Sequence, residues 1–304
     1  MSTTQLLECQ TCGAQLEVAR YHRSVSCAYC ASPSVLERPP TPDRPNPTFA
    51  LGFKITRDSA LTHARRWIRR SLLAPGAFRR AAVEATQGVY VPAYLYTAAA
   101  YSWYRAEIGE EYYEDETYET RNDEGEKVTE TRQVKRHEWR SLSGDHAVYI
   151  NDHVVTASRG LQNHELQGIA PFDLRSLQRF TPALISGWIA EDPSIGKHRS
   201  LEMARAHART RLREQLSDFM PGDCHRLIRH HSEFHDEHME LALLPVWVLP
   251  VAYAADKPAV RLLVNGQTGQ VFGRSPISIV KVIALAALAI AIALLIYFYA
   301  PPSP

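Results

Sequence analysis

The stretch Glu240–Tyr253, ELALLPVWVLPVAY, decides how the middle of this chain folds. It is rich in Leu, Val and aromatic residues, which predicts a strand in the core of a sheet. A second stretch, Val89–Tyr104, has the same character. Both contain the pattern V/L-P-x-aromatic, at Val91–Tyr94 and at Leu244–Trp247. We therefore expect two related strands in the fold.

A helix is predicted before each of these strands. The first begins at an N-cap, Asp58, and runs to about Leu73, with an apolar stripe toward the core and the arginines of Arg65–Arg70 on its other side. The second spans about Ser200–Phe219. Because the order of helix and strand occurs twice, it suggests a duplicated α+β unit.

The sequence thus predicts an α+β body, residues 49–273, with an antiparallel sheet. After Glu240–Tyr253 we expect a strand at Val260–Val264, a tight turn at Asn265–Gly269 and a short return strand at Gln270–Phe272. Five large side chains are expected to be largely buried in this body: Trp67, Tyr90, Leu244, Trp247 and Phe272.

Residues 107–140 form a charged insertion in the body. Glu107–Glu126 has ten carboxylates and one arginine, whereas Lys127–Arg140 has five basic residues and two glutamates. We expect a hairpin that turns at Asn122–Gly125 and places opposite charges across its two strands. The expected pairs are Arg121 with Glu126, Asp115 with Arg132, and Glu111 with Arg136.

Two cysteine pairs near the N-terminus have the spacing of a zinc site. Each has the form C-x-x-C, and 14 residues separate the second cysteine from the third. Each pair places two thiolates on one tight turn, and four thiolates in a tetrahedron suit one structural Zn²⁺. Residues 1–37 are therefore expected to form a zinc ribbon, and a rubredoxin-like iron site is the alternative. The expected ligands are Cys9, Cys12, Cys27 and Cys30.

Residues 38–48 are rich in proline. Five prolines lie between Pro39 and Pro47, and such a segment favours extended polyproline geometry of about 3.1 Å per residue. We expect a linker that separates the N-terminal module from the body.

The last part of the chain is strongly apolar. Ile277–Tyr299 has 23 residues and one charge, Lys281, which is long enough to cross a hydrocarbon core of about 30 Å as a helix. The sequence therefore predicts a single transmembrane helix at 276–300. Because Arg274 and Lys281 lie at its start and Met1–Leu7 lacks the features of a signal peptide, we expect a tail anchor in the inner (cytoplasmic) membrane. The N-terminal part would then lie in the cytoplasm.

The overall composition is that of a folded protein without a strong net charge. The formal net charge is +1 and 45% of the 304 residues are hydrophobic, which excludes a disordered chain and gives no general attraction to nucleic acid. The sequence has no phosphate-binding loop of the P-loop type, no G-x-S-x-G and no H-E-x-x-H. We therefore expect a protein that is not an enzyme.

Two further groups of residues have side chains that bind metals or react. Five histidines lie between His225 and His238. Because this region leads into a strand, their directions alternate, and we expect a solvated edge rather than a second metal site. Cys224 lies outside the two cysteine pairs, and no base can be assigned to it.

At several segments the chain resembles a bacterial family of membrane-anchored proteins with a TFIIB-type zinc ribbon, which are often mislabelled as primosomal-helicase-like. The matching segments are the two C-x-x-C pairs, Phe53–Phe78, Gly88–Pro92, Ala170–Leu174 with Ile185–Glu191, and Leu243–Trp247 with Val264–Gly269. The resemblance implies a cytosolic, non-enzymatic body tethered to the membrane, with flotillin-like or phage-shock-type proteins as partners. This chain departs from the family at Ala93–Tyr94, where an aromatic pair is usual, and in its charged hairpin.

These features predict a membrane-tethered adaptor that docks protein partners at the cytoplasmic face of the membrane, including those of envelope-stress assemblies. The alternative is a membrane-anchored zinc-ribbon protein that binds nucleic acid or has a regulatory role. Arg20–Arg23 and Tyr29 would give the ribbon a basic and aromatic face for such binding. Nucleic acid is less favoured, because these basic residues are few and also offset the negative charge of four thiolates.

Overall fold

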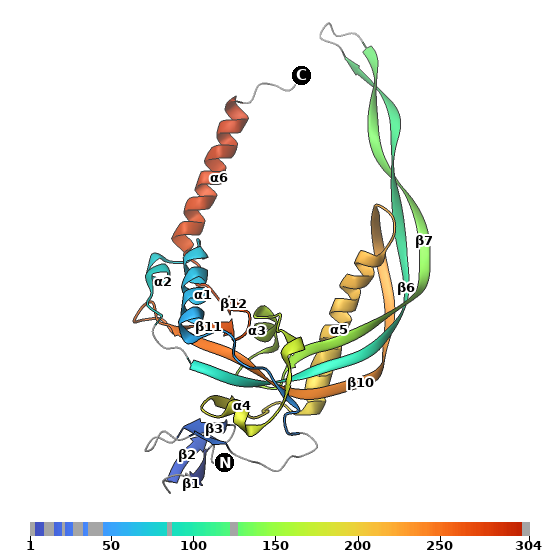
Figure 1. Cartoon of the computed structure of the whole chain (residues 1–304). Helices are drawn as coiled ribbons and strands as arrows, with labels where there is room; N and C mark the ends of the chain where they lie inside the picture. The colour runs from blue at the N-terminus through green and yellow to red at the C-terminus, as the bar shows by residue number, and fades with distance from the viewer. Residues whose placement is uncertain are drawn as a thin grey trace. The chain divides into compact units, whose positions relative to one another are not determined.

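The computed structural model of the chain describes residues 4–8, 15–19, 22–26, 33–35, 45–83, 87–121 and 127–299. These residues form a sheet-rich α+β fold, with long paired strands and separate helices (Figure 1). The chain divides into two compact units. Unit 1 comprises Met1–Leu95, Val154–Ser200 and Glu240–Pro304, and unit 2 comprises Tyr96–His153 and Leu201–Met239.

This division does not follow the predicted duplication. Each unit takes segments from both halves of the chain, so neither unit is one helix–strand repeat. The two matching motifs, Val91–Tyr94 and Leu244–Trp247, both belong to unit 1 and lie on strands that neighbour each other in the sheet. The motifs therefore mark two adjacent central strands of one unit.

The central strands of unit 1 belong to β6 (Gln87–Arg121) and β10 (Cys224–Val251), which are paired. β10 also pairs antiparallel with β11 (Val260–Asn265), and β11 pairs antiparallel with β12 (Val271–Gly273). The strands predicted from Val89 and from Glu240 are thus present, and both begin earlier than the sequence suggests.

Two short strands make the sheet mixed, which corrects the predicted antiparallel sheet. β5 (Phe49–Ala50) runs parallel to β10 and antiparallel to β8 (Gln178–Arg179). β9 (Ile189–Glu191) runs parallel to β6. Parallel neighbours require long connections, and here they come from segments far away in the sequence.

The two faces of β10 pack on different helices. Leu244 and Val246 belong to one buried cluster, together with Leu166 of α3 (Asn163–Gly168). Trp247 belongs to a second cluster, together with Ile68 of α1 (Arg57–Arg70). Because side chains alternate along a strand, a strand covered on both faces needs a nearly continuous apolar run. This explains the sequence LLPVWVLPV.

Of the five side chains predicted to be buried, Tyr90, Leu244 and Trp247 are buried, whereas Trp67 and Phe272 are half-buried. α1 begins after the N-cap Thr56, whose side chain accepts a hydrogen bond from Ser59 N at 3.3 Å, so the cap is not Asp58. The remaining short helices are α2 (Gly76–Arg80), η1 (Leu174–Ser176) and α4 (Pro182–Ile185).

The predicted turn at Asn265–Gly269 is confirmed. Gly269 N donates to Asn265 O at 3.0 Å, and Gly269 has a φ of +75°, a conformation that favours glycine. The Asn265 side chain is fully buried and makes four hydrogen bonds. Its amide donates to Ile169 O and Pro171 O, and its oxygen accepts from Gln267 N and Thr268 N. The turn is thus tied to the segment that follows α3.

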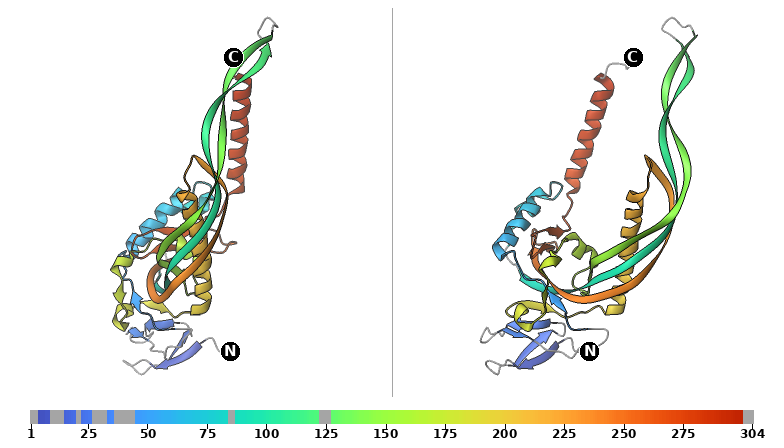
Figure 2. Two further views of the ribbon diagram at one scale, coloured as in Figure 1. Left: turned by 90° about the vertical axis from the view of Figure 1, so that its right-hand side faces the viewer. Right: turned by 45° about the vertical axis from the view of Figure 1, so that its right-hand side comes forward.

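Unit 2 consists of the outer parts of β6 and β10, most of β7 (Lys127–Thr156) and most of α5 (Lys197–Phe219). β7 pairs with β6, and the two strands form a long hairpin that Figure 2 shows from two sides. α5, predicted from Ser200, begins three residues earlier. It packs Leu216 against Tyr104 and Ala106 of β6, on one face of this part of the sheet.

The charged hairpin carries opposite charges across its strands, but not in the predicted pairs. Arg132 pairs with Glu116 at 2.9 Å rather than with Asp115. Arg136 pairs with Glu114 at 2.6 Å rather than with Glu111, which pairs with Lys135 at 2.5 Å. The predicted pair of Arg121 with Glu126 and the predicted turn at Asn122–Gly125 lie outside the residues whose side chains are described.

The described N-terminal strands are β1 (Thr4–Glu8), β2 (Gln15–Ala19), β3 (His22–Ser26) and β4 (Pro33–Val35). β1 pairs antiparallel with β2, and β3 pairs antiparallel with both β4 and β9. The predicted zinc ligands and residues 38–44 of the linker lie outside the described residues. Within the described ranges, no group of three or more His, Cys, Asp or Glu side chains is placed to hold a metal ion. The described residues thus do not support the zinc-ribbon part of the predicted fold class, while the four cysteine ligands lie outside these residues and stay a prediction.

The C-terminal helix α6 spans Ile279–Tyr299, and its described side chains are mostly exposed. Among the described residues, no helix combines the length and apolar character that crossing a membrane requires. This finding contradicts the predicted transmembrane helix at 276–300, the tail anchor and the inner-membrane localisation.

Candidate binding site

An open hollow on the sheet of unit 2 is the strongest candidate site. It measures about 380 Å³ and is lined by residues from three strands, with Tyr101 and Trp103 on β6 between a β7 segment and a β10 segment. We call it the aromatic groove. Its lining residues include Tyr101, Trp103, Asp145, His146, His231 and Glu233.

Strand alternation explains why aromatic side chains lie in the open here. Tyr101 and Trp103 are 56% and 52% exposed, whereas Ser102 and Tyr104 between and beyond them are 3% and 6% exposed. Tyr104 packs against α5 residues. Successive residues of a strand point to opposite faces, so the α5 side of the sheet is buried and the other side presents the two rings.

Polar groups frame the two rings. Asp145 and Glu233 are carboxylates in the lining, and the Glu233 carboxylate lies 3.6 Å from His231 Nε2 and 3.5 Å from His235 Nε2. The His235 ring meets the Tyr101 ring edge to face, with 5.4 Å between centroids. The groove thus combines exposed rings with a carboxylate on either side, a composition suited to apolar and basic groups.

The His146 side chain lies on the opposite face of the sheet from the Tyr101 and Trp103 rings. Its Nδ1 is buried and has no hydrogen-bond partner in the described part of the chain. Its ring lies 5.1 Å from the ring of Phe219, at the end of α5. The ring therefore packs on the α5 side of the sheet, beside Tyr104, whose ring also contacts Phe219.

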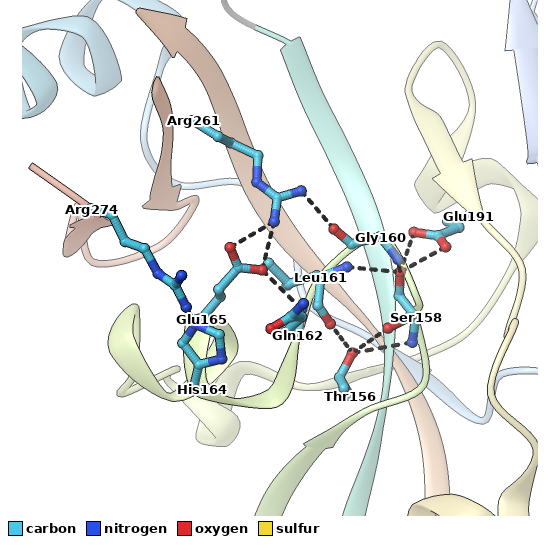
Figure 3. A network of polar contacts seen from close by, with 10 residues as sticks. All are labelled: Thr156, Ser158, Gly160, Leu161, Gln162, His164, Glu165, Glu191, Arg261 and Arg274. Carbon is cyan, nitrogen blue, oxygen red and sulfur yellow. Dashed lines mark hydrogen bonds and ion pairs between the residues drawn. The ribbon is translucent and has the colours of Figure 1, made fainter. Parts of the chain in front are cut away.

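A second buried polar site, in unit 1, holds a loop in place. Ser158 Oγ lies 2.7 and 2.8 Å from the two carboxylate oxygens of Glu191 and accepts hydrogen bonds from Gly160 N and Leu161 N (Figure 3). Burial raises the pKa of Glu191, and the bond from Ser158 opposes that rise. The donor and the acceptor capacity of the Ser158 hydroxyl are therefore both taken up by hydrogen bonds within the protein, which indicates a structural role rather than catalysis.

The same loop is fastened to β11 by an ion pair. Arg261 Nη2 lies 2.6 Å from both oxygens of Glu165, and Arg261 Nη1 donates to Gly160 O at 2.7 Å (Figure 3). Glu165 also accepts from Gln162 N at 2.9 Å and so caps α3. Burial tends to raise the pKa of Glu165, but the bonds from Arg261 and Gln162 outweigh it, and the pKa is lowered.

Replacing Arg261 by glutamine should lower the free energy of unfolding by about 1–2 kcal/mol, because a mostly buried carboxylate loses its partner. Since the folded-state pKa of Glu165 is below its ordinary 4.5, the stabilisation is present above pH 4.5 and is lost as the pH falls through the folded-state value. Urea unfolding should therefore show the difference at neutral pH and a smaller one in acid. Arg274→Gln, at an exposed arginine near His164, is the control, and an equal loss there would contradict the assignment.

The five histidines between His225 and His238 all lie on β10, and in the described part of the chain they form no metal-binding group. His225 Nε2 lies 2.8 Å from Ser217 Oγ, and His230 Nδ1 lies 3.1 Å from Ser232 Oγ, while His231 and His235 approach Glu233. Two of them therefore belong to the aromatic groove or its edge. Cys224 is half-buried, with Sγ 3.7 Å from Gly109 O.

Sequence reasoning did not find the aromatic groove or the pair formed by the buried His153 and the half-buried His207. His153 and His207 stack with ring centroids 4.4 Å apart, and burial, then the neighbouring His207 and Arg211, lower the pKa of His153 to about 4. The signal available for the groove was the spacing of Tyr101 and Trp103, since aromatic residues two apart on a strand share a face.

No protein-family model matches the chain, and no solved structure matches it. The chain is 24% identical over 249 residues to the uncharacterized protein YdjG of Bacillus subtilis (strain 168). The match covers 78% of this chain and 66% of YdjG, so the chain spans just under two thirds of that relative's length. The likeness shows a distant relative and carries no activity to this chain.

Proposed function

We propose that this chain is a non-enzymatic adaptor that docks a protein partner in the aromatic groove of unit 2. The observation that carries the proposal is the exposure of Tyr101 and Trp103 side by side in a hollow of about 380 Å³. Tyr and Trp are enriched among the residues that dominate protein–protein binding energy, especially where they lie near the centre of a contact.

The energetic argument rests on the area that a partner would cover. A tyrosine or tryptophan side chain has roughly 150–250 Å² to bury. With about half of each ring exposed, covering both would contribute roughly 4–6 kcal/mol at about 25 cal/mol per Å², before the cost of association. This is enough to make the two rings the anchor of an interface.

The charges of the groove favour a basic partner segment. Asp145 and Glu233 flank the rings, so a lysine or arginine of the partner would gain both an ion pair and a contact with a ring face. The same carboxylates would repel the phosphates of a nucleic acid. The groove therefore supports the adaptor over the alternative of nucleic-acid binding.

The cysteine pairs would add a second, rigid module to the adaptor. In the sequence, one pair falls between β1 and β2 and the other between β3 and β4, and both strand pairs are antiparallel. Four thiolates from two strand connections suit a structural Zn²⁺. The resemblance to the zinc-ribbon family makes flotillin-like and phage-shock-type proteins the first partner candidates to test.

Trp103→Ala should abolish most partner capture, because it removes the larger of the two rings from the groove. We expect at least a tenfold loss of bound partner in affinity capture with the full chain as bait. Tyr113→Ala is the matched control, since Tyr113 is a 66% exposed aromatic residue of the same strand and does not line the groove.

The two variants decide the proposal together. Capture that falls with Trp103→Ala and persists with Tyr113→Ala supports docking in the groove. Capture that is equal in the wild type and in Trp103→Ala contradicts it. If the captured material is removed by nuclease and its binding falls steeply with salt, nucleic-acid binding replaces the adaptor function.

A further inference from the structure

A second hollow, in unit 1, is lined by four arginines. It measures about 320 Å³ and lies between α1 and the segment of α2, with Arg65 and Arg69 from the first and Arg79 and Arg80 from the second. Ile68 and Ala81 complete the lining. We call it the arginine hollow.

The charge of this region contrasts with that of the whole chain. Residues 57–83 contain seven arginines and one aspartate, whereas the whole chain has a formal net charge of +1. Among the described residues, no carboxylate pairs with the guanidinium groups of Arg65, Arg69, Arg79 or Arg80. Four like charges that converge without a counterion repel one another, so an anion placed among them would relieve that repulsion.

Helix dipoles explain part of this pattern and leave part of it unexplained. Arg69 lies in the last turn of α1, and Arg79 and Arg80 lie in the last turn of α2, where basic residues are favourable. Arg65 lies one turn earlier, on the same face of α1 as Arg69. The helix dipole therefore does not account for Arg65, which also lines the hollow.

The local backbone allows one guanidinium to lie close to the chain. A Cβ added at Gly76 would meet Arg80 Nη1 at 3.3 Å, so the missing side chain of Gly76 leaves room for the Arg80 guanidinium. Ile68 of α1, which is 2% exposed, lines the hollow on the side of that helix. The hollow is therefore bounded by the apolar residues Ile68 and Ala81 and by four exposed arginines.

We propose that the arginine hollow binds anions that carry phosphate groups. Guanidinium groups present planar pairs of N–H donors that match phosphate oxygens, which makes arginine the preferred residue for such recognition. The volume of about 320 Å³ is within the range of small-molecule sites. The phosphate can come from a soluble anion such as pyrophosphate or from a phospholipid headgroup.

The test compares two double variants of the full chain that remove the same charge. Arg65→Gln with Arg79→Gln removes two guanidinium groups of the hollow. Arg66→Gln with Arg70→Gln removes two exposed arginines of α1 that do not line it. Binding of pyrophosphate is measured by calorimetry, and binding of phosphatidylglycerol vesicles, with phosphatidylcholine as reference, is measured by flotation.

We expect saturable binding of at least one of these probes, with about a hundredfold loss in the first double variant and less than a threefold loss in the second. Pyrophosphate binding assigns a soluble anion, and binding to phosphatidylglycerol vesicles alone assigns a headgroup. Equal losses in both double variants would overturn the site, because they would indicate general charge attraction. Absence of saturable binding to either probe would also overturn it.

Discussion

Replacing Asn265 by alanine should lower the free energy of unfolding by about 3–4 kcal/mol. The side chain is fully buried, and its four hydrogen bonds join the turn 265–269 to the carbonyl groups of Ile169 and Pro171. Alanine would leave two carbonyl oxygens and two backbone N–H groups without partners, and each buried unsatisfied group costs about 1–3 kcal/mol. Chemical denaturation followed by tryptophan fluorescence would measure the loss.

Two further variants give this prediction its controls. Asn265→Asp keeps the acceptor for Gln267 N and Thr268 N but places a charge against two carbonyl groups, so it should be as damaging as alanine. Gln270→Ala, at an exposed position just after the turn, should change the free energy of unfolding by less than about 0.5 kcal/mol. A small effect of Asn265→Ala would mean that the turn is held by other contacts.

Cys12→Ser should remove the metal and unfold the N-terminal module. We expect the purified wild type to carry one zinc per chain, and the variant to carry almost none, because three thiolates bind far more weakly than four. Metal content by elemental analysis is the measurement. Structural zinc contributes roughly 10–16 kcal/mol to the folding of small modules, so this is the largest effect expected for the chain.

The body should remain folded in that variant. Its two principal clusters are built from residues between Phe49 and Phe272, although β3 pairs with β9 and its loss would open one strand edge. Cys224→Ser is the control and should keep the metal. A zinc content in Cys12→Ser equal to that of the wild type would rule out the four-cysteine site.

The sequence identifies elements with a strong local pattern. The strands at Val89 and Glu240 and the helices at Asp58 and Ser200 are present, because apolar runs and amphipathic stripes are local signals. The turn at Asn265–Gly269 is present because Gly269 supplies a positive φ. These elements depend on residues that are close together in the chain.

The features that the sequence did not predict depend on contacts between residues that are far apart in the chain. β5 has two residues and β9 has three, and each joins the sheet in parallel beside a strand from elsewhere in the chain. The hairpin charges were paired in the wrong register by one residue at Arg132 and by three at Arg136, because such shifts leave most of the charge complementarity intact. The aromatic groove requires Trp103, Asp145 and His231 to meet, and no local pattern predicts that meeting.

The predicted transmembrane helix is wrong for a different reason. It rested on the length and apolar composition of Ile277–Tyr299, and no helix in the described ranges satisfies both requirements for a membrane span.

The discontinuous composition of unit 1 has a consequence for how the protein folds during synthesis. Unit 1 needs segments from three parts of the chain, and Leu51 N bonds to Leu243 O at 2.9 Å across almost two thirds of it. Unit 2 needs only residues 96–239, so all of it leaves the ribosome before Glu240–Asn265. Closing a long loop costs entropy that shorter contacts reduce when they form first. Unit 1 is therefore expected to complete its folding after unit 2, and until β10 is complete the edge of β6 that β10 will cover has no partner strand and needs protection from aggregation.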